Sequence, residues 1–122
     1  SWIAESTRDA HVLNLFCYTA TASVAAALGG ARSSVSVDLS PTYTAWAERN
    51  FRLNGLTAEH RIVTADAVEW LKTRSERFDF IYLDPPSFSN SKRTRTVLDV
   101  QRDHVDLLRS ALAHLKPGGR LL

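Results

Sequence analysis

Apolar residues occur along the chain in short runs that alternate with longer amphipathic segments. Runs rich in β-branched and aromatic residues predict strands at 11–17, 34–39, 61–65 and 78–83, and residues 120–122 begin a fifth. The segments between them have helical spacing. Because strands alternate with helices throughout, the sequence predicts an α/β fold with a doubly wound parallel sheet and right-handed crossovers.

Capping residues predict where the helices begin. Residues 1–9 are expected to form a helix or a lead-in, and Thr19 or Thr21 is expected to cap the next helix, which ends at 29–30. Ser40 followed by Pro41 predicts the start of a third helix.

Apolar stripes predict which helical faces are buried. The helix that begins at Ser40 and ends at 54–55 is expected to bury Tyr43, Trp46 and Leu53. Asp66, with Glu69 three residues later, resembles a capping box that opens a helix reaching about residue 75. Three tryptophans are expected to anchor the core: Trp2, Trp46 and Trp70.

A last amphipathic helix is expected to run to Lys116, where the sequence Pro117-Gly118-Gly119 breaks it. Its His104 falls on the apolar stripe, where a histidine is more often a core residue than a catalyst. The predicted stripe consists of Val97, Leu98, Gln101, His104, Val105, Leu108, Leu112 and Leu115.

Asp84-Pro85-Pro86 follows the predicted strand at 78–83, which is apolar enough to be buried on both faces. Two prolines fix φ and remove two amide donors, so neither strand nor helix continues there. In open α/β sheets, ligands bind at the carboxyl ends of the strands. The turn and the following Phe88 are therefore a candidate site, although a solvated loop after a proline-terminated strand explains the same residues.

The net charge of the chain says little about function, but the local distribution of basic residues does. The chain has 122 residues, 15 of them Lys or Arg and 13 Asp or Glu, and its formal charge of +2 does not by itself indicate a nucleic-acid-binding protein. Lys92, Arg93 and Arg95 nevertheless fall within four positions, and no acidic residue occurs at 85–98. This basic run is a candidate for binding phosphates or, equally, a solvated loop.

Composition excludes several other classes. With 44% hydrophobic and 23% charged residues, the chain is typical of a single globular domain. No apolar run is long enough to span a membrane and no leader is apparent, so a cytoplasmic protein is expected. The single cysteine, Cys17, is expected to be a small buried hydrophobe. No metal site is expected, because the histidines and Cys17 lack metal-ligand spacing.

The turn after the first strand excludes a nicotinamide dinucleotide. A pyrophosphate needs a glycine-rich turn there, but this chain has Tyr18-Thr19-Ala20. Two acidic residues are better placed for another nucleoside. Asp38 at the end of the second strand suits the two hydroxyls of a ribose, and Asp66 after the third suits an adenine amino group, although an N-cap alone explains Asp66.

Together these features resemble the class I S-adenosylmethionine-dependent methyltransferases, whose core is a Rossmann-like doubly wound sheet. The resemblance is closer still to the guanine-N7 methyltransferase module of the bifunctional enzyme that modifies bacterial 23S ribosomal RNA. It covers nearly the whole chain and is most specific at 84–93 and 99–104. The segments that carry it are VLNLFCYTATASVAAALGGA, VDLSPTYTAWAERNFRLNGL, LDPPSFSNSKR and DVQRDH.

This resemblance implies S-adenosylmethionine as cofactor, ribosomal RNA as partner and a set of site residues. The cofactor-binding residues implied are Phe16, Tyr18, Thr19, Ala20, Asp38, Leu39, Asp66, Ala67 and Asp84. The catalytic residues implied are Asp84, Pro85 and Phe88, and the residues implied to bind RNA are Lys92, Arg93 and Arg95.

Two departures from the family pattern are notable. The family has glycine where this chain has Ala20, so a methyl group is expected where cofactor and backbone nearly touch. Such sheets also normally close with two more strands after the fifth. Residues 1–122 are therefore expected to be a partial domain excised from a longer chain, with the fifth strand as an exposed edge.

The expected reaction is methyl transfer to N7 of a guanine in 23S ribosomal RNA. N7 has an available lone pair, so alignment with the methyl group provides most of the acceleration. Three alternatives stay open: methylation of an exocyclic amino group (guanine N2 or adenine N6), methylation of cytosine C5, and a cofactor-binding fragment without activity. The C5 reaction needs a nucleophilic cysteine beside the base, whereas the resemblance puts Cys17 near the cofactor.

Overall fold

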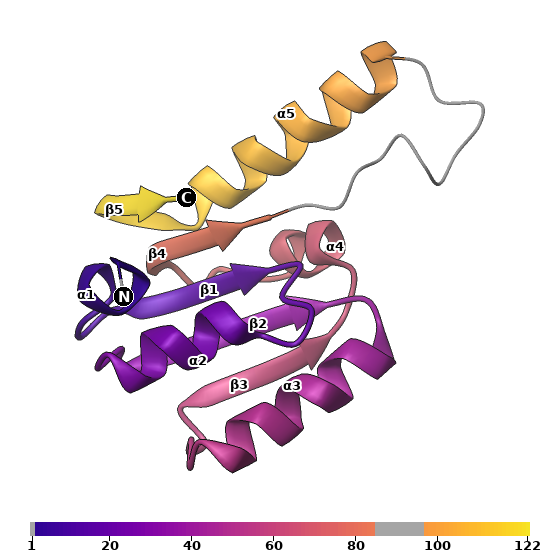
Figure 1. Ribbon diagram of the computed structural model, residues 1–122. Helices are drawn as coiled ribbons and strands as arrows, with labels where there is room; N and C mark the ends of the chain where they lie inside the picture. Colours follow the sequence, from indigo (N-terminus) through magenta and orange to yellow (C-terminus); the bar gives the residue numbers. More distant parts are fainter. Residues whose placement is uncertain (1, 85–96) are drawn as a thin grey trace.

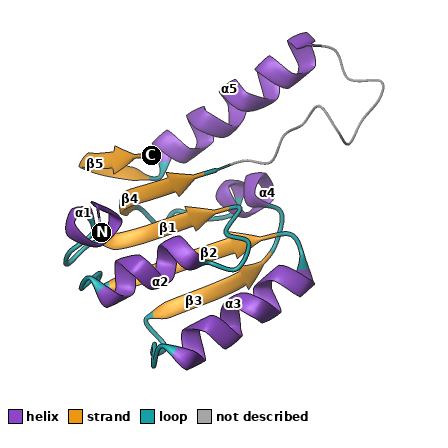
Figure 2. Cartoon of the chain, in the orientation of Figure 1, coloured by secondary structure: helices purple, strands orange, loops and turns teal. Residues whose placement is uncertain are grey.

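The structure is a computed structural model that describes residues 2–84 and 97–122. Its five parallel strands form one sheet in the order β3-β2-β1-β4-β5, as Figures 1 and 2 show, which confirms the predicted α/β fold. The elements are α1 (Trp2–Ser6), β1 (His11–Leu15), α2 (Thr21–Leu28), β2 (Ser33–Asp38), α3 (Pro41–Leu53), β3 (His60–Thr64), α4 (Ala67–Lys72), β4 (Phe78–Leu83), α5 (Val97–Ala113) and β5 (Leu115–Leu121).

The sheet is buried on both faces. On β1, Leu13 and Leu15 pack with α4 and α5, whereas Val12, the residue before Leu13, packs with Ala26 of α2 on the other face. A third cluster lies between α2 and α3 and contains Cys17, Ala20, Ala47 and Phe51. Since successive residues of a strand point to opposite faces, this alternation requires the nearly continuous apolar run that the sequence has there.

The predicted strands are confirmed, with shifted ends. Strand β1 ends at Leu15 rather than at residue 17, and β4 spans Phe78–Leu83 as predicted. The last helix ends at Ala113 rather than at Lys116, because Leu115 already pairs with Phe78 of β4. The Pro-Gly-Gly segment therefore lies within β5, and an irregular register between the two strands accommodates it.

The predicted buried face of α3 is wrong. Tyr43, Trp46 and Leu53 are 39%, 49% and 84% exposed, so Trp46 is not a core anchor. The helix instead buries Thr44, Ala47 and Phe51. Small side chains at the contact let the helix axis approach the sheet closely, which turns the larger aromatic residues toward the flank. Trp70 is buried as predicted, and the side chain of Trp2 lies outside the described residues.

The predicted buried face of α5 is also wrong over its described part. Val105, Leu108 and Leu112 are about half exposed, and His104 is exposed rather than in the core. Leu107 and Ala111 face the sheet instead. Sequence periodicity located the amphipathic helix correctly, but the neighbouring elements determine which side of it is covered.

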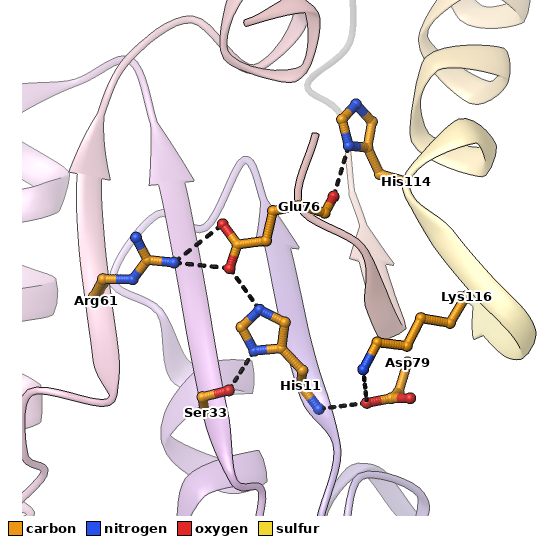
Figure 3. Close-up of polar contacts among 7 residues, drawn as sticks. All are labelled: His11, Ser33, Arg61, Glu76, Asp79, His114 and Lys116. Atoms are coloured by element: carbon orange, nitrogen blue, oxygen red, sulfur yellow. Dashed lines mark hydrogen bonds and ion pairs between the residues drawn. The ribbon is translucent and has the colours of Figure 1, made fainter. Parts of the chain in front are cut away.

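A polar network joins the amino ends of the strands, at the opposite edge from the candidate site (Figure 3). His11 Nε2 donates to Glu76 Oε2 over 2.6 Å, and its Nδ1 contacts the Ser33 hydroxyl. Arg61 Nη2 donates to the same Glu76 oxygen over 2.9 Å. The backbone N–H of His11 donates to Asp79 Oδ2 over 2.8 Å. This network connects β1, β2 and β3 to the segment that leads into β4.

Candidate active site

The predicted site residues follow the carboxyl ends of four strands. Phe16 comes directly after β1, Asp38 ends β2, Asp66 follows β3 and Asp84 follows β4. These strands are parallel and adjacent in the order β3-β2-β1-β4, so their carboxyl ends lie along one edge of the sheet (Figure 1). The four residues, which end or follow the strands, therefore lie at this edge. Ligands of open α/β sheets bind at this edge.

The turn between β1 and α2 has an unusual backbone. Phe16, Tyr18 and Ala20 have φ values of 59°, 51° and 64°, in the left-handed region that non-glycine residues rarely adopt. Two backbone hydrogen bonds close the turn, from Cys17 N to Val37 O and from Ala20 N to Cys17 O. Strained backbone of this kind is often found at ligand-binding sites.

Ala20 is the N-cap of α2, so the predicted caps, Thr19 or Thr21, are wrong. The left-handed backbone conformation of Ala20, rather than a capping side chain, turns the chain into the helix. The Ala20 methyl group is fully buried in the core cluster that also contains Cys17, Ala47 and Phe51. It therefore points into the core between α2 and α3.

Asp38 binds the backbone on both sides of the site. Its Oδ2 accepts from Tyr18 N over 3.0 Å, and its Oδ1 accepts from Ser40 N over 2.9 Å. The residue is only 8% exposed, whereas the neighbouring Leu39 is 67% exposed. Each carboxylate oxygen keeps a further lone pair for a hydroxyl donor. Ser40 caps α3 as predicted, so Asp38 is not needed as its N-cap.

A small cavity of about 160 Å³ lies between the turn and the end of β4. Asn14 of β1 lines it and is 2% exposed. Its Nδ2 donates to Ser23 Oγ over 2.9 Å, but its Oδ1 has no hydrogen-bond partner among the residues that the structure describes. A buried acceptor without a partner is rare unless a ligand or water satisfies it. The other residues that line the cavity are Phe16, Cys17, Tyr18, Thr19, Thr21, Ala22, Tyr82 and Asp84.

Tyr18 connects this cavity to α3. Burial raises the pKa of its hydroxyl, and the nearby carboxylates of Asp84 and Asp38 raise it further. Its ring packs edge-on against Tyr43 at 5.4 Å between centroids. Sequence reasoning missed Tyr43 as a neighbour of the site because helical periodicity assigned it to the core.

Asp66 and Ala67 lie elsewhere along the edge. Asp66 is the N-cap of α4, as predicted, and accepts from Glu69 N over 3.1 Å, while Ala67 is buried. Asp66 lines a cavity of about 540 Å³ together with residues of α4 and α5, such as Lys72. Asp66 and Asp84 therefore line different cavities in the described part of the chain.

The remaining predicted site residues lie outside the described residues: Pro85, Phe88, Lys92, Arg93 and Arg95. Among residues 2–84 and 97–122, no group of three or more His, Cys, Asp or Glu side chains is arranged to hold a metal ion. Over the same residues, no helix is both long and apolar enough to cross a membrane.

Comparison with known proteins identifies close relatives. Over 121 residues the chain is 56% identical to the ribosomal RNA large subunit methyltransferase K/L of Cellvibrio japonicus, covering 98% of this chain and 16% of that protein. Over 109 residues it is 61% identical to the protein of the same name from Pseudomonas entomophila, covering 89% of this chain and 15% of that one. The chain thus spans about a sixth of the length of these relatives.

Solved structures agree with these relatives. A methyltransferase crystallised with S-adenosylhomocysteine superposes with a TM-score of 0.84 at 36% identity, covering 98% of this chain and 32% of that one. The sequence pattern of the S-adenosylmethionine-dependent methyltransferases matches residues 1–122. The chain therefore belongs to the S-adenosylmethionine-dependent methyltransferase family.

Proposed function

We propose that this chain transfers a methyl group from S-adenosylmethionine to N7 of a guanine in the 23S ribosomal RNA of the large subunit. One observation carries the proposal: the chain is 52–61% identical to proteins named as large-subunit ribosomal RNA methyltransferases. Such a substrate would place the reaction in the cytoplasm. The choice of N7 rests on the resemblance of residues 84–93 and 99–104 to the guanine-N7 module.

The carboxyl edge suits the cofactor chemically. The unpartnered Asn14 Oδ1 and the neighbouring Asp84 give the cavity beside Tyr18 acceptors for a cationic or N–H donor group. The Asp38 carboxylate, next to the exposed Leu39, would accept from the ribose hydroxyls. When bound, the cofactor supplies an electrophilic methyl group. The residues that would hold it are Phe16, Tyr18, Thr19, Ala20, Asp38, Leu39, Asp66, Ala67 and Asp84.

In this proposal the protein acts mainly by positioning. Guanine N7 needs no deprotonation, so no general base is required and alignment provides most of the acceleration. Asp84 is exposed at the mouth of the cavity, where its carboxylate would accept from the N–H groups of the guanine edge. We further propose that the Pro85 carbonyl shares this task, that Phe88 stacks on the base, and that Lys92, Arg93 and Arg95 bind RNA phosphates.

The replacement Asp84→Asn tests the assignment in the intact protein. Methyl transfer to ribosomal RNA should fall about 100-fold or more, since the carboxylate that orients the base is lost, while the calorimetric Kd for S-adenosylmethionine rises far less, by about tenfold or below, because Asp84 is one of several residues that would hold the cofactor. Glu59→Gln is the matched control, because Glu59 is an exposed acid at the opposite edge of the sheet. Equal losses of cofactor binding and transfer would contradict a role of Asp84 in holding the base.

Product analysis tests the choice of atom. Mass spectrometry of nucleosides from treated RNA should detect 7-methylguanosine. An N2-methylguanosine or N6-methyladenosine product would overturn the N7 assignment while keeping the methyltransferase. A 5-methylcytidine product would require a nucleophilic cysteine, and Cys17 is the single cysteine of the sequence.

A further inference from the structure

One flank of α3 presents two aromatic residues and an arginine to solvent. Tyr43 and Trp46 are exposed and lie three residues apart, so they are neighbours on the helix surface. The guanidinium of Arg49, three residues further on, lies 5.9 Å from the centre of the Trp46 ring. We call Tyr43, Trp46 and Arg49 the α3 stripe.

The stripe continues the candidate active site. Tyr43 packs edge-on against Tyr18, a residue that is itself 39% exposed. Tyr18 in turn lines the cavity that contains Asp84. Aromatic side chains therefore extend from the predicted methyl-transfer edge, through Tyr18 and Tyr43, to Trp46 one turn further along α3.

The charge around the stripe is favourable for a polyanion. Glu48 is the one acidic residue of α3, and it lies on the other flank, where it lines a small cavity with Phe51 and His60 near β3. The neighbouring segment 16–28, which contains the turn and α2, has no acidic residue. Neither α2 nor α3 therefore places a negative charge on the flank of α3 that carries Arg49.

Exposed aromatic rings beside a guanidinium group are the combination that binds unpaired nucleotides. Bases stack on aromatic rings whatever their sequence, and arginine adds cation–π and phosphate contacts. A surface used only to keep the protein in solution does not need two adjacent aromatic residues.

We propose that the α3 stripe binds single-stranded RNA that flanks the target nucleotide, with bases stacked on Tyr43 and Trp46 and a phosphate at Arg49. This proposal rests on the proposed function, and it adds where the RNA next to the target nucleotide would lie on the protein. A base delivered into an active site is unstacked from its neighbours. The flanking nucleotides then need new stacking partners, and the stripe adjoins the site.

Variants in the intact protein test this path with an unstructured RNA oligonucleotide. Trp46→Ala should raise the Kd for the oligonucleotide about tenfold, and Trp46→Phe should restore most of the binding because it keeps an aromatic ring. Arg49→Gln should weaken binding and reduce its salt dependence. Arg52→Gln is the matched control, because Arg52 lies with Glu48 on the other flank.

Three further measurements separate the possible results. The Kd for S-adenosylmethionine and the thermal midpoint should be unchanged in every variant, and ultraviolet cross-linking should attach RNA to the peptide that contains Tyr43 and Trp46. Unchanged RNA binding in Trp46→Ala, with methyl transfer intact, would overturn the stripe but not the proposed function. A lower thermal midpoint with unchanged RNA binding would also overturn the proposal for the stripe. Its side chains would then stabilise the fold rather than bind RNA.

If the unmodified protein binds S-adenosylmethionine but transfers no methyl group to any ribosomal RNA, the proposed function itself fails. That result is distinguishable from failure of the stripe alone, which leaves transfer by the unmodified protein intact.

Discussion

The side-chain amide of Asn50 donates to the backbone carbonyl of Thr19 over 2.9 Å. This hydrogen bond joins the middle of α3 to the turn after β1, 31 residues earlier in the chain. The same turn is held on its other side by Asp38, which accepts from Tyr18 N. The left-handed backbone at 16–20 is therefore stabilised from two elements that follow it in sequence.

Asn50→Ala should loosen this turn. Removing the donor leaves the Thr19 carbonyl without its partner, which costs about 1 kcal/mol of unfolding free energy. The Kd for S-adenosylmethionine, measured by calorimetry, should rise about fivefold because the turn is less ordered before binding. Asn50→Asp, which keeps the size but removes the donor, should behave in the same way.

The control for this prediction is Asn54→Ala. Asn54 is the C-cap residue of the same helix and donates from its side chain to the Asn50 carbonyl over 2.8 Å at an exposed position. Its replacement should leave the Kd for the cofactor unchanged. Similar changes in both variants would mean that general destabilisation of α3, rather than the contact with Thr19, affects binding.

Ala20→Gly should not alter cofactor binding. The Ala20 methyl group faces Ala47 and Phe51 in the core, so its removal opens no space at the site. Glycine relieves the strain at φ 64° but loses the buried methyl group and gains freedom in the unfolded state. These effects are each about 1 kcal/mol, so stability should change by less than about 1 kcal/mol. A tenfold tighter Kd would show instead that the methyl group obstructs the cofactor.

Cys17 should be chemically inert in the folded protein. Burial, together with the Asp38 carboxylate, raises the pKa of its thiol to about 12. At pH 8 the reactive thiolate is therefore scarce, and iodoacetamide should modify native Cys17 at least about 100-fold more slowly than the unfolded chain. Cys17→Ala should retain methyl transfer. Loss of transfer with the fold intact would favour the cytosine-C5 mechanism, which needs this thiolate.

The Glu76 network should make stability depend on pH in the acidic range. Partial burial raises the pKa of Glu76, but hydrogen bonds from His11 and Arg61 outweigh it, so the pKa lies below its ordinary value of 4.5. A carboxyl with a lowered folded-state pKa contributes stability above pH 4.5 and loses it as the pH falls through the folded-state value. Urea unfolding between pH 6 and pH 3 measures this loss.

Glu76→Gln provides the comparison. It should lower the unfolding free energy at pH 6 by about 1 kcal/mol and make the decline toward pH 3 shallower. Asp79, whose pKa is lowered chiefly by the hydrogen bond from His11 N, should account for part of the slope that remains. An unchanged slope in Glu76→Gln would exclude this network as a source of the pH dependence.

Much of the site could be predicted from residue order alone. The strand at Phe78–Leu83, the N-caps Ser40 and Asp66 and the positions of Asp38 and Asp84 at strand ends all follow from local patterns. In a parallel sheet whose strands alternate with helices, strand ends collect at one edge. The sequence therefore predicted the edge, its acidic residues and the family.

Local patterns could not predict how the elements pack. Periodicity identifies an amphipathic helix, but Tyr43 and Trp46 became exposed because Ala47 and Thr44 let α3 approach the sheet closely. The left-handed turn at 16–20 could not be predicted from local patterns either, because no residue in it requires positive φ. Hydrogen bonds with Asp38 and Asn50, which come later in the chain, hold the turn in this conformation.

The sequence by itself thus determined the α/β fold, the edge that carries the candidate site and the family, because these depend on the order and type of residues along the chain. Only the tertiary structure decided that the Ala20 methyl group faces the core, that Asp66 and Asp84 line different cavities, and that aromatic residues of α3 adjoin the site. These features depend on contacts between residues far apart in the chain. The size and close packing of the side chains determine these contacts.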